Sequence, residues 1–289
     1  MSVRNSITAQ TKILCIIGHP VEHSMSPVMH NAALQDLGLN FTYMAFTVIP
    51  SQLKNAIRGI KSIGINGFNV TIPHKEIIMK YLDKIDPLAK KIGAINTVKN
   101  EGGILIGRNT DALGAKKGLL DAGCKINGKN ILIMGAGGAA RAICYILAEQ
   151  ANRIVIVNRT EKRAIKLVKN LKKNIDVNAE GKNNSEIILK EETSKADILI
   201  NTTSVGMYPS TNQSPITKSI LHSDLFVFDV IYNPIETKLI RDAKGIGCKT
   251  LGGLDMLINQ GVLAFEWWTN KKPNRDLMKR KVIEILEMK

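Results

Sequence analysis

A short segment that follows a strand-like run carries the first residue with clear chemical potential. Residues 69–75, Asn-Val-Thr-Ile-Pro-His-Lys, leave an apolar run, turn at Pro73 and present Lys75 where a helix is expected to begin. A cation is unfavourable at the N-terminus of a helix, so its presence there hints that the lysine is placed for chemistry. An ammonium group can donate a proton to an oxygen that gains negative charge.

A carboxylate in a second segment is the natural partner for that ammonium. Residues 107–111, Gly-Arg-Asn-Thr-Asp, end with Asp111 at the start of an expected helix. An aspartate at that place can cap the helix N-terminus. Its carboxylate can instead favour and hold the charged form of a nearby lysine. The local pattern leaves both roles open for Asp111.

The strongest local motif is a glycine-rich turn. A strand-like run, residues 131–134, leads directly into Gly-Ala-Gly-Gly-Ala-Ala, and an apolar helical pattern follows to about Glu149. This matches the dinucleotide-binding fingerprint in its required strand–turn–helix context, although a turn needed for packing alone is the other reading. Glycines let backbone amides approach a pyrophosphate at the helix N-terminus, which favours an anion. The residues expected to bind the cofactor are Gly135, Ala136, Gly137, Gly138 and Ala139.

The end of the next strand-like run chooses between NAD and NADP. An acidic residue there would bind the ribose 2′-hydroxyl and repel a 2′-phosphate. This chain has Asn158-Arg159-Thr160 instead, and Arg163 follows closely. Guanidinium groups suit bidentate phosphate contacts. Glu161 falls in the first turn of the expected helix, where a carboxylate favours the helix dipole. The pattern predicts NADP as the cofactor.

Two series of alternating strands and helices must position these residues, as in proteins with parallel sheets. Ser26 followed by Pro27 is expected to cap the first helix. Residues 173–195 are polar and rich in Lys and Asn, and we expect a surface loop with one short strand there. The expected strands are residues 12–17, 42–46, 67–70, 97–98, 104–106, 131–134, 154–157, 198–200 and 225–230. The expected helices whose limits can be given are residues 27–37, 52–63, 110–122, 253–267 and 276–288.

Composition limits the classes of protein to consider. The 289 residues are 44% hydrophobic and 22% charged, enough for two domains with cores. No apolar run approaches the roughly 20 residues that span a bilayer, and no signal peptide is evident, so we expect a cytoplasmic protein without membrane contact. The four cysteines lie far apart without CxxC pairs, which favours buried free thiols and no metal site.

The net charge of +15 raises the question of a nucleic-acid partner. The basic excess is spread along the chain, and no helix-turn-helix, zinc finger or aromatic stacking motif accompanies it. We therefore expect no nucleic acid. Such charge can still attract an anionic cofactor and substrate.

The order and spacing of many short motifs resemble the shikimate dehydrogenase family over essentially the whole chain. Those of the first part are Gly18-His19-Pro20, His23-Ser24-Met25-Ser26-Pro27, residues 69–75, Gly93-Ala94-Ile95-Asn96-Thr97 and Asn109-Thr110-Asp111. Those of the second part are residues 135–139, Asn158-Arg159-Thr160, Asn201-Thr202-Thr203-Ser204, Asp229-Val230-Ile231-Tyr232-Asn233-Pro234 and Gly253-Leu254-Asp255-Met256-Leu257, followed by Gln260.

The resemblance implies an α/β fold with two domains. Residues 1–113 and 251–289 would form the substrate-binding catalytic domain. Residues 114–250 would form a Rossmann-type, doubly wound NADP-binding domain, and the C-terminal helices would return to the first domain. The implied activity is the reversible reduction of 3-dehydroshikimate to shikimate by NADPH, in the biosynthesis of aromatic amino acids.

The resemblance also assigns roles to individual residues. Lys75 and Asp111 would be the catalytic pair, and Ser24 and Ser26 would bind the substrate carboxylate. The ring hydroxyls of the substrate or neighbouring polar groups would be contacted by Asn69, Thr71, Asn96 and Gln260. The pocket would be lined by Tyr232. The implied cofactor contacts outside the glycine turn are Asn158, Arg159, Thr160, Arg163, Thr203, Val230, Gly253 and Met256.

Three questions stay open at the level of sequence. Asp255 stands where the family usually has glycine, which raises the question of an altered turn or charge near the nicotinamide. Trp267 and Trp268 fit either the core or an oligomer contact, so a homodimer remains an option. The nearest alternative is a quinate/shikimate dehydrogenase that uses NAD as well. An alternative of another class is a non-enzymatic dinucleotide-sensing or nucleic-acid-binding protein.

Overall fold

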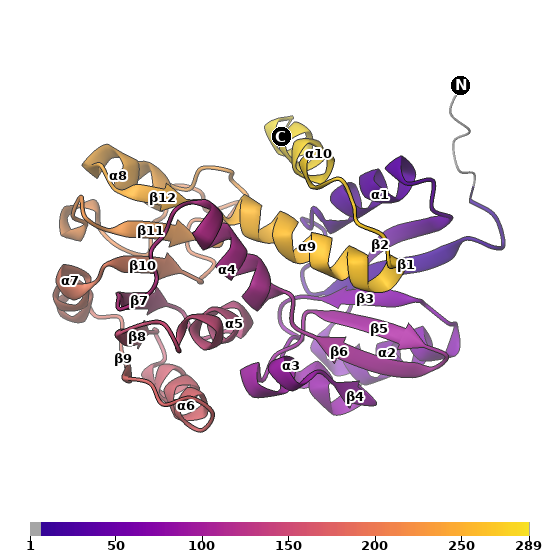
Figure 1. The fold of residues 1–289 in the computed structure, drawn as a ribbon, viewed down its shortest axis with the longest axis horizontal. Helices are drawn as coiled ribbons and strands as arrows, with labels where there is room; N and C mark the ends of the chain where they lie inside the picture. Colours follow the sequence, from indigo (N-terminus) through magenta and orange to yellow (C-terminus); the bar gives the residue numbers. More distant parts are fainter. Residues whose placement is uncertain (1–6, 289) are drawn as a thin grey trace. The chain divides into compact units, whose positions relative to one another are not determined.

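Two six-stranded sheets organise residues 7–288, the part of the chain that the computed structural model describes (Figure 1). Contacts divide this part into two units, of which the first comprises residues 7–110 and 258–288 and the second Asp111–Leu257. The second division falls within the long helix α9 (Gly253–Thr269). From the sequence we expected the NADP-binding domain to comprise residues 114–250 and the substrate-binding domain to comprise the rest. This assignment of the two functions stays a prediction.

The first unit contains a mixed sheet in the order β2-β1-β3-β5-β6-β4. β1 pairs in parallel with β2 and β3, β4 pairs in parallel with β6, and β5 is antiparallel to β3 and β6. The elements of this unit before α9 are β1 (Lys12–Gly18), α1 (Ser26–Asp36), β2 (Phe41–Thr47), η1 (Pro50–Gln52), α2 (Leu53–Ser62), β3 (Gly67–Val70), η2 (Ile77–Tyr81), β4 (Lys84–Ile85), α3 (Pro87–Ile92), β5 (Thr97–Glu101) and β6 (Ile104–Arg108).

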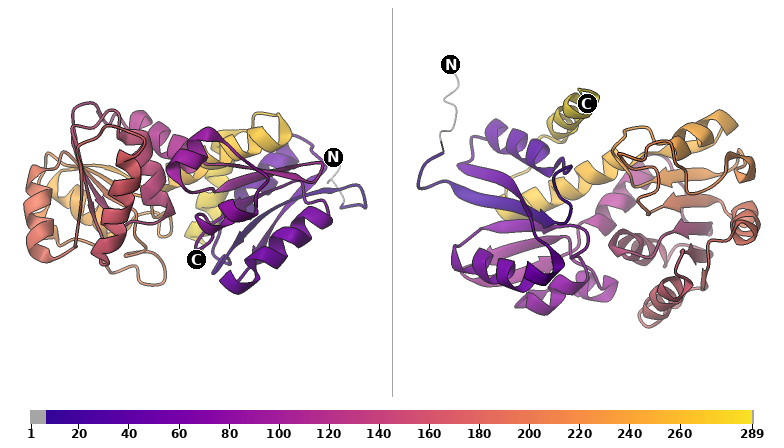
Figure 2. Two further views of the ribbon diagram at one scale, coloured as in Figure 1. Left: turned by 90° about the horizontal axis from the view of Figure 1, so that it is seen from below. Right: turned by 180° about the vertical axis from the view of Figure 1, so that it is seen from behind.

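Each face of this sheet has its own cover. On one face the apolar side of α2 packs into a core with Phe68, Val98 and Leu105. On the other face lie α1 and the aromatic residues of α9, where the indole of Trp268 donates a hydrogen bond to the Val98 carbonyl at 2.9 Å. The last helix, α10 (Arg275–Glu287), packs beside α1 (Figure 2). The C-terminal helical residues therefore return to the first unit, as predicted.

The second unit is built around a fully parallel sheet in the order β12-β11-β10-β7-β8-β9. Its central strands are apolar and buried along almost their whole length, as expected for strands covered on both faces. Helices lie on both sides of the sheet in Figure 2. The elements of this unit before α9 are α4 (Asp111–Asp121), β7 (Asn130–Met134), α5 (Gly138–Leu147), β8 (Arg153–Val157), α6 (Glu161–Lys172), β9 (Ala179–Lys182), α7 (Glu186–Lys195), β10 (Ile198–Asn201), η3 (Lys218–Ile220), β11 (Phe226–Asp229), α8 (Lys238–Ile246) and β12 (Lys249–Leu251).

This order confirms the predicted doubly wound fold. The chain proceeds from the central strand β7 to β8 and β9 on one side, and then from β10 to β11 and β12 on the other. The carboxyl ends of β7 and β10 therefore flank the point where the strand order reverses. Ligands of open α/β sheets bind at that point.

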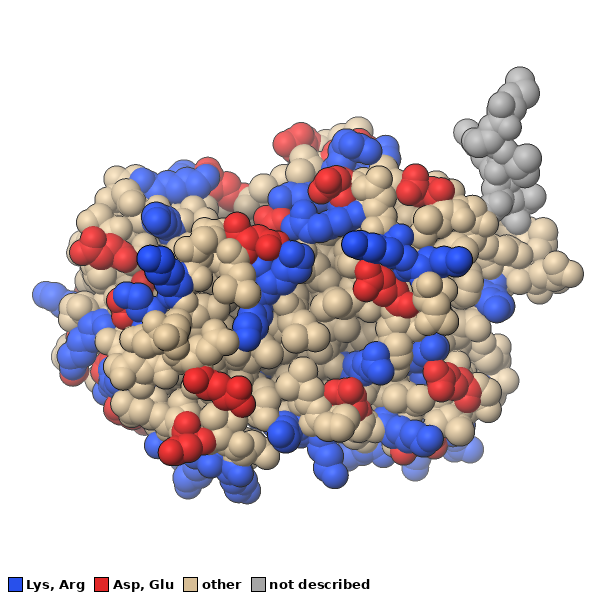
Figure 3. Space-filling view, in the orientation of Figure 1, with Lys and Arg blue, Asp and Glu red and all other residues tan. Residues whose placement is uncertain are grey.

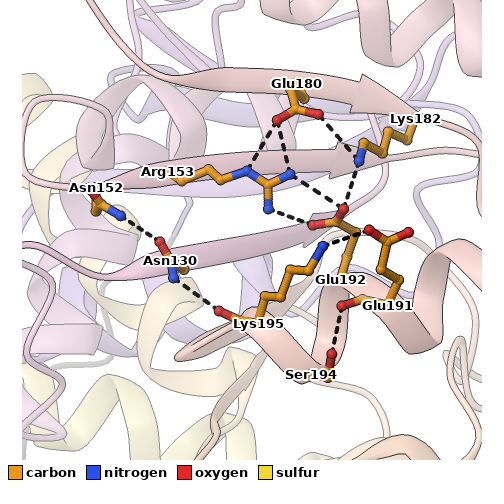
Figure 4. Close-up of polar contacts among 9 residues, drawn as sticks. All are labelled: Asn130, Asn152, Arg153, Glu180, Lys182, Glu191, Glu192, Ser194 and Lys195. Atoms are coloured by element: carbon orange, nitrogen blue, oxygen red, sulfur yellow. Dashed lines mark hydrogen bonds and ion pairs between the residues drawn. The ribbon is translucent and has the colours of Figure 1, made fainter.

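The polar segment of residues 173–195 is not mainly a loop, and the expectation for it was wrong. It contains β9, which was expected as a short strand, and also the helix α7. Four charged side chains join these elements, as Figure 4 shows. Arg153 and Lys182 donate hydrogen bonds of 2.6 and 2.7 Å to the buried carboxylate of Glu192, and both also pair with Glu180. The buried residues of α7 are Leu189, Glu192 and Thr193, so its buried face is not a purely apolar stripe and hydrophobic periodicity did not reveal the helix.

The charge network has a clear electrostatic consequence. Burial alone would raise the pKa of Glu192, but the hydrogen bonds from Arg153 and Lys182 outweigh it and lower that pKa from 4.5 to about 2. The carboxylate is therefore charged in the folded protein at neutral pH. It holds β8, β9 and α7 together at one edge of the sheet.

Two absences concern only the part of the chain that the structure describes. No helix within residues 7–288 is long and apolar enough to cross a membrane. Likewise, no three or more His, Cys, Asp or Glu side chains of these residues gather in a way that could hold a metal ion. The four cysteines are all buried free thiols, as predicted.

On the face drawn in Figure 3, lysine and arginine side chains are interspersed with aspartate and glutamate. They do not gather into one large basic patch on that face. The interpretation of the positive charge as solvated side chains fits this distribution.

Candidate active site

A tightly held turn between α3 and β5 is the centre of the polar site in the first unit. Asp86 caps α3 by accepting hydrogen bonds from the Leu88 and Ala89 amides at 3.0 and 3.4 Å. Gly93 ends the helix with a φ of 74°, a conformation that glycine adopts at little cost. The chain then enters residues 94–96 with their backbone fixed.

Asn96 is buried and uses its amide group to join three segments. Its Oδ1 accepts hydrogen bonds from the Thr110 amide at 2.7 Å and the Thr97 hydroxyl at 3.1 Å. Its Nδ2 donates to Thr110 Oγ1 at 2.9 Å and to Gln260 Oε1 at 3.3 Å. The structure thus brings together Asn96 and Gln260, which are 164 residues apart in the chain and were both predicted to bind substrate.

Asn69 is joined to the same group from β3. Its Nδ2 donates to the Asn96 carbonyl at 3.0 Å and to Thr97 Oγ1 at 3.1 Å. Its Oδ1 accepts a hydrogen bond from the Tyr43 hydroxyl at 2.6 Å. All of these side chains are buried, so the group is a preorganised set of amides and hydroxyls. Such a set suits a small polyhydroxylated molecule, because each hydroxyl needs a donor or an acceptor partner.

The structure also shows how Lys75 is held. Its carbonyl accepts a hydrogen bond from the Ile95 amide at 2.8 Å, and its side chain is half-buried. The predicted α-helix start at this lysine was wrong, because only the short 3-10 helix η2 follows, beginning at Ile77. The helix dipole therefore gives little support to a chemical role for Lys75, since a 3-10 helix of five residues has a small dipole.

Asp111 directly follows a segment held by the same turn. Asn109 donates a hydrogen bond to the Ala94 carbonyl at 2.9 Å, and the Thr110 amide donates to Asn96. Asp111 is buried and is the first residue of α4, so it lies within the helix rather than at the residue before it. Lys75 belongs to the first unit, and Asp111 begins the second.

The two serines predicted to bind a carboxylate lie at the start of α1. Ser24 Oγ accepts a hydrogen bond from the Ser26 amide at 3.2 Å. The prediction that Ser26 caps this helix was wrong, because Met25 occupies the cap position and Ser26 is already helical. Ser26 is buried in the first turn of this helix. Thr71, from the same predicted set, is half-buried just after β3.

Sequence reasoning did not identify three residues of this polar group as site residues: Tyr43, Thr97 and Thr110. The two threonines stand inside motifs that carried the family resemblance, so their position beside predicted site residues was an available signal. Tyr43 lies on β2, where the strand pattern gives no indication of its hydrogen bonds. Its position next to Asn69 arises only from the pairing of β2, β1 and β3.

In the second unit the glycine turn has the geometry that the fingerprint requires. Gly135 has a φ of 106°, and a Cβ built on it would lie 2.6 Å from Thr202 Oγ1, so a larger residue is excluded there. Gly137 occupies the cap position of α5, and no side chain of the described residues caps that helix. A Cβ on Gly137 would meet no atom within 4 Å. The first amides of α5 are therefore suited to an anion.

The end of β8 presents the side chains predicted to choose the cofactor. Asn158 donates a hydrogen bond from Nδ2 to the Thr160 carbonyl at 2.9 Å, and its amide donates to the Lys182 carbonyl at 3.1 Å. These bonds shape the turn into α6. The side chains of Arg159 and Arg163 are exposed beside this turn, where solvent and a phosphate can reach them.

Asn201, at the end of β10, is hydrogen-bonded to two of the other predicted cofactor residues, Thr203 and Val230. Its Oδ1 accepts hydrogen bonds from the amide and the hydroxyl of Thr203 at 3.0 and 2.7 Å. Its carbonyl accepts from the Val230 amide at 3.0 Å. A Cβ on Gly253 would overlap the Val230 carbonyl, so only glycine fits beside this strand end. Met256 is buried on the same helix as Gly253.

A buried carboxyl group supports these strand ends. Asp229 accepts hydrogen bonds from Asn201 Nδ2 at 3.0 Å, the Ile231 amide at 3.1 Å and the Thr237 hydroxyl at 2.7 Å. Burial raises its pKa from 3.8 to about 6, although these hydrogen bonds oppose the change. Tyr232, predicted to line the substrate pocket, is half-buried just beyond this strand and belongs to the second unit.

Asp255 does not disturb the local backbone. It lies in the first turn of α9, where any residue adopts the backbone conformation and a carboxylate favours the helix dipole. Substitution of the family's usual glycine therefore changes the charge at this place but requires no altered turn.

The two tryptophans are also explained. Trp268 is buried in the core of the first unit, while Trp267 is half-buried and stacks under the Arg108 guanidinium at 4.3 Å from its ring centre.

Comparison with known protein families gives three matches along the chain. Residues 16–98 match the shikimate dehydrogenase substrate binding domain. Residues 117–242 match the shikimate / quinate 5-dehydrogenase family, and residues 253–283 match the shikimate 5'-dehydrogenase C-terminal domain. The three matches together cover most of the chain.

Individual relatives agree with these matches. The chain is 49% identical over 279 residues to the shikimate dehydrogenase (NADP(+)) of Methanocaldococcus jannaschii, covering 96% of this chain and 98% of that protein. It is 45% identical to that of Methanopyrus kandleri, covering 99% and 100%. A crystal structure of a shikimate dehydrogenase in complex with NADP+ is similar with a TM-score of 0.91 at 46% identity, covering 99% of both chains.

A more distant structure is that of the quinate dehydrogenase of Corynebacterium glutamicum in complex with NAD. It is similar with a TM-score of 0.86 at 28% identity, covering 95% of this chain and 99% of that one.

Proposed function

The chain belongs to the shikimate dehydrogenase family, and on that premise we propose that it reversibly reduces 3-dehydroshikimate to shikimate with NADPH. The reaction is a step in the biosynthesis of aromatic amino acids. The observation that carries the proposal is the buried set of amide and hydroxyl groups around Asn96 in a chain that also has a dinucleotide turn followed by Arg159.

We propose Lys75 as the general acid of the reduction. NADPH supplies a hydride to the carbonyl carbon of the substrate. Negative charge then grows on the carbonyl oxygen, and a protonated Lys75 stabilises that charge and donates a proton to it. In the reverse direction a neutral Lys75 accepts the hydroxyl proton.

Asp111 is proposed to orient the ammonium group of Lys75. The support is that both residues depend on the same turn. The Lys75 carbonyl accepts from the Ile95 amide, and the Thr110 amide donates to Asn96, the neighbour of Ile95. Asp111 follows Thr110 directly in the chain. A carboxylate beside a lysine favours its charged form and reduces its freedom, which aids proton donation in the reductive direction.

The substrate is proposed to bind through both of its polar ends. Ser24 and Ser26 would hold the carboxylate, since hydroxyl groups at the start of α1 can donate hydrogen bonds to an anion. Asn69, Thr71, Asn96 and Gln260 would contact the ring hydroxyls or orient the groups that do so, and Tyr232 would line the pocket.

The proposed cofactor contacts divide by chemistry. The turn from Gly135 to Ala139 would hold the pyrophosphate on backbone amides. Asn158, Arg159, Thr160 and Arg163 would hold the adenosine ribose with its 2′-phosphate, which explains a preference for NADP. Thr203, Val230, Gly253 and Met256 would lie along the nicotinamide half.

A cytoplasmic location is part of the proposal. Four buried free thiols and the lack of a disulfide among the described residues suit a reducing compartment. A homodimer also stays a prediction, and light scattering would measure it. The burial of Trp268 gives a dimer no support, because its hydrogen bond to Val98 places it in the core.

A spectrophotometric assay with the purified chain tests the function. Shikimate and quinate would each be offered with NADP+ and with NAD+, and the rise in absorbance of the reduced cofactor followed. We expect the highest kcat/KM with shikimate and NADP+. A preference for quinate with NAD+ would establish the alternative specificity, and no turnover with any pair would support a non-enzymatic dinucleotide-binding role.

A further inference from the structure

The hydrogen bonds of Asn69 determine which way its side chain faces. Nδ2 lies 3.0 Å from the Asn96 carbonyl, a group that can only accept. If the amide were reversed, two oxygens would face each other there without a hydrogen atom between them. The NH2 group must therefore point to Asn96 and Thr97, and Oδ1 must point to Tyr43.

In this orientation Asn69 has no N–H group left for a further partner. Its two N–H groups are used by the Asn96 carbonyl and Thr97 Oγ1. Its Oδ1 has two lone pairs, and among the described residues the Tyr43 hydroxyl engages one of them at 2.6 Å. The Oδ1 atom of Asn69 can therefore accept one further hydrogen bond, but Asn69 cannot donate another. A phenol has a single hydrogen, so Tyr43 uses it on Asn69.

Tyr43 is itself held from several directions. The Asn31 side chain accepts a hydrogen bond from the Tyr43 amide at 2.8 Å and donates one to its carbonyl at 2.9 Å. His30 stacks on the phenol ring, with ring centres 4.5 Å apart and planes inclined by 16°. Burial raises the pKa of Tyr43 well above 10, so its hydroxyl keeps its hydrogen at any working pH.

We propose that Tyr43 is a positioning residue of the substrate site: its hydroxyl holds the Oδ1 atom of Asn69 in place, and the remaining lone pair of that oxygen selects a substrate hydroxyl. This rests on the proposed function, because it takes Asn69 as a substrate-binding residue. Tyr43 acts through Asn69 and does not itself need to touch the reacting atoms.

The test is the Tyr43→Phe variant, which keeps the ring that stacks on His30. Loss of one hydrogen bond of this kind weakens binding by about 2- to 10-fold. We expect the KM for shikimate to rise by about that factor, with the KM for NADP+ unchanged and kcat nearly so. Tyr145→Phe, which removes the hydroxyl of a buried tyrosine in the second unit, is the matched control and should change neither constant.

A double-mutant cycle separates positioning from general stability. If Tyr43 acts through Asn69, Tyr43→Phe should have little further effect on the KM for shikimate in an Asn69→Ala background. Equal effects of Tyr43→Phe in both backgrounds, or an unchanged KM for shikimate in the single variant, would overturn the proposal. Absence of turnover in the unmodified enzyme would instead contradict the proposed function, so the two failures are distinguishable.

A second measurement keeps the hydroxyl group at position 43. 3-Fluorotyrosine placed at position 43 of the full chain gives one fluorine resonance. We expect shikimate to shift this resonance, because it binds Asn69, to which the Tyr43 hydroxyl donates. NADP+ alone should leave the resonance unchanged. A resonance that does not respond to saturating shikimate would refute the positioning role.

Discussion

Glutamine in place of Glu192 should remove most of the acid sensitivity that the charge network of Figure 4 gives to the second unit. The Glu192 side chain is 1% exposed and bonds to Arg153 and Lys182. Its pKa falls from 4.5 to about 2 in the folded protein. The folded state therefore favours the charged form. The stability that this group provides is fully present above pH 4.5 and is lost as the pH falls toward 2.

The magnitude follows from that change. A tenfold change in an acid constant corresponds to about 1.4 kcal/mol, so the lowered pKa corresponds to roughly 3 kcal/mol. The two cationic side chains are 19% and 24% exposed, and solvent reduces the value somewhat. We expect Glu192→Gln to lower the free energy of unfolding at pH 7 by about 2–3 kcal/mol.

Urea denaturation followed by circular dichroism, from pH 7 down to the lowest pH at which the protein folds, provides the assay. The difference between the variant and the original chain should shrink as the pH falls below about 4.5. Glu191→Gln is the matched control, because Glu191 pairs with Lys195 at the surface, where an ion pair contributes at most about 1 kcal/mol. A Glu192→Gln difference that stays constant with pH, or that equals the Glu191→Gln difference, would refute the reasoning.

Two other substitutions test the cofactor unit. Arg159→Ala should raise the KM for NADP+ by about 10-fold or more and leave the KM for NAD+ nearly unchanged, since a hydrogen bond to a charged group is worth about 1.5–3 kcal/mol. The control Lys169→Ala, on the exposed side of α6, should change neither KM. An equal loss for both cofactors would contradict the phosphate role of Arg159. Asp229→Asn should gain stability relative to the original chain as the pH rises from about 4 to about 6, because a raised pKa of about 6 makes the charged carboxylate costly in the folded state. Denaturation at the two ends of that range measures it, and a difference that falls with rising pH would contradict the assigned pKa.

The parts of the fold with strong hydrophobic patterns were predictable from sequence. β7, β8 and β10 are continuous apolar runs, and the glycine turn after β7 has a fixed chemical requirement. The helix α7 was missed because its buried face includes a carboxylate, Glu192, whose burial depends on partners from two separate strands. No local pattern contains that information.

The site was predictable to the extent that its residues lie in recognisable motifs. Asn69, Asn96 and Gln260 were identified through the resemblance, and the structure joins them in one hydrogen-bonded group. Tyr43 could not be found in the same way, because its role depends on strand pairing across the sheet. The local errors at Ser26 and Lys75 came from placing helix starts by residue type, while the backbone begins its helical conformation one or two residues away.

The most direct test of the catalytic claim is a double-mutant cycle on kcat with Lys75→Ala, Asp111→Asn and the combined variant, using shikimate and NADP+. If Asp111 acts by orienting Lys75, the lysine variant should lose activity by orders of magnitude, and adding Asp111→Asn to it should reduce kcat little further. Independent, multiplicative losses, or a Lys75→Ala enzyme with unaltered kcat, would contradict the account.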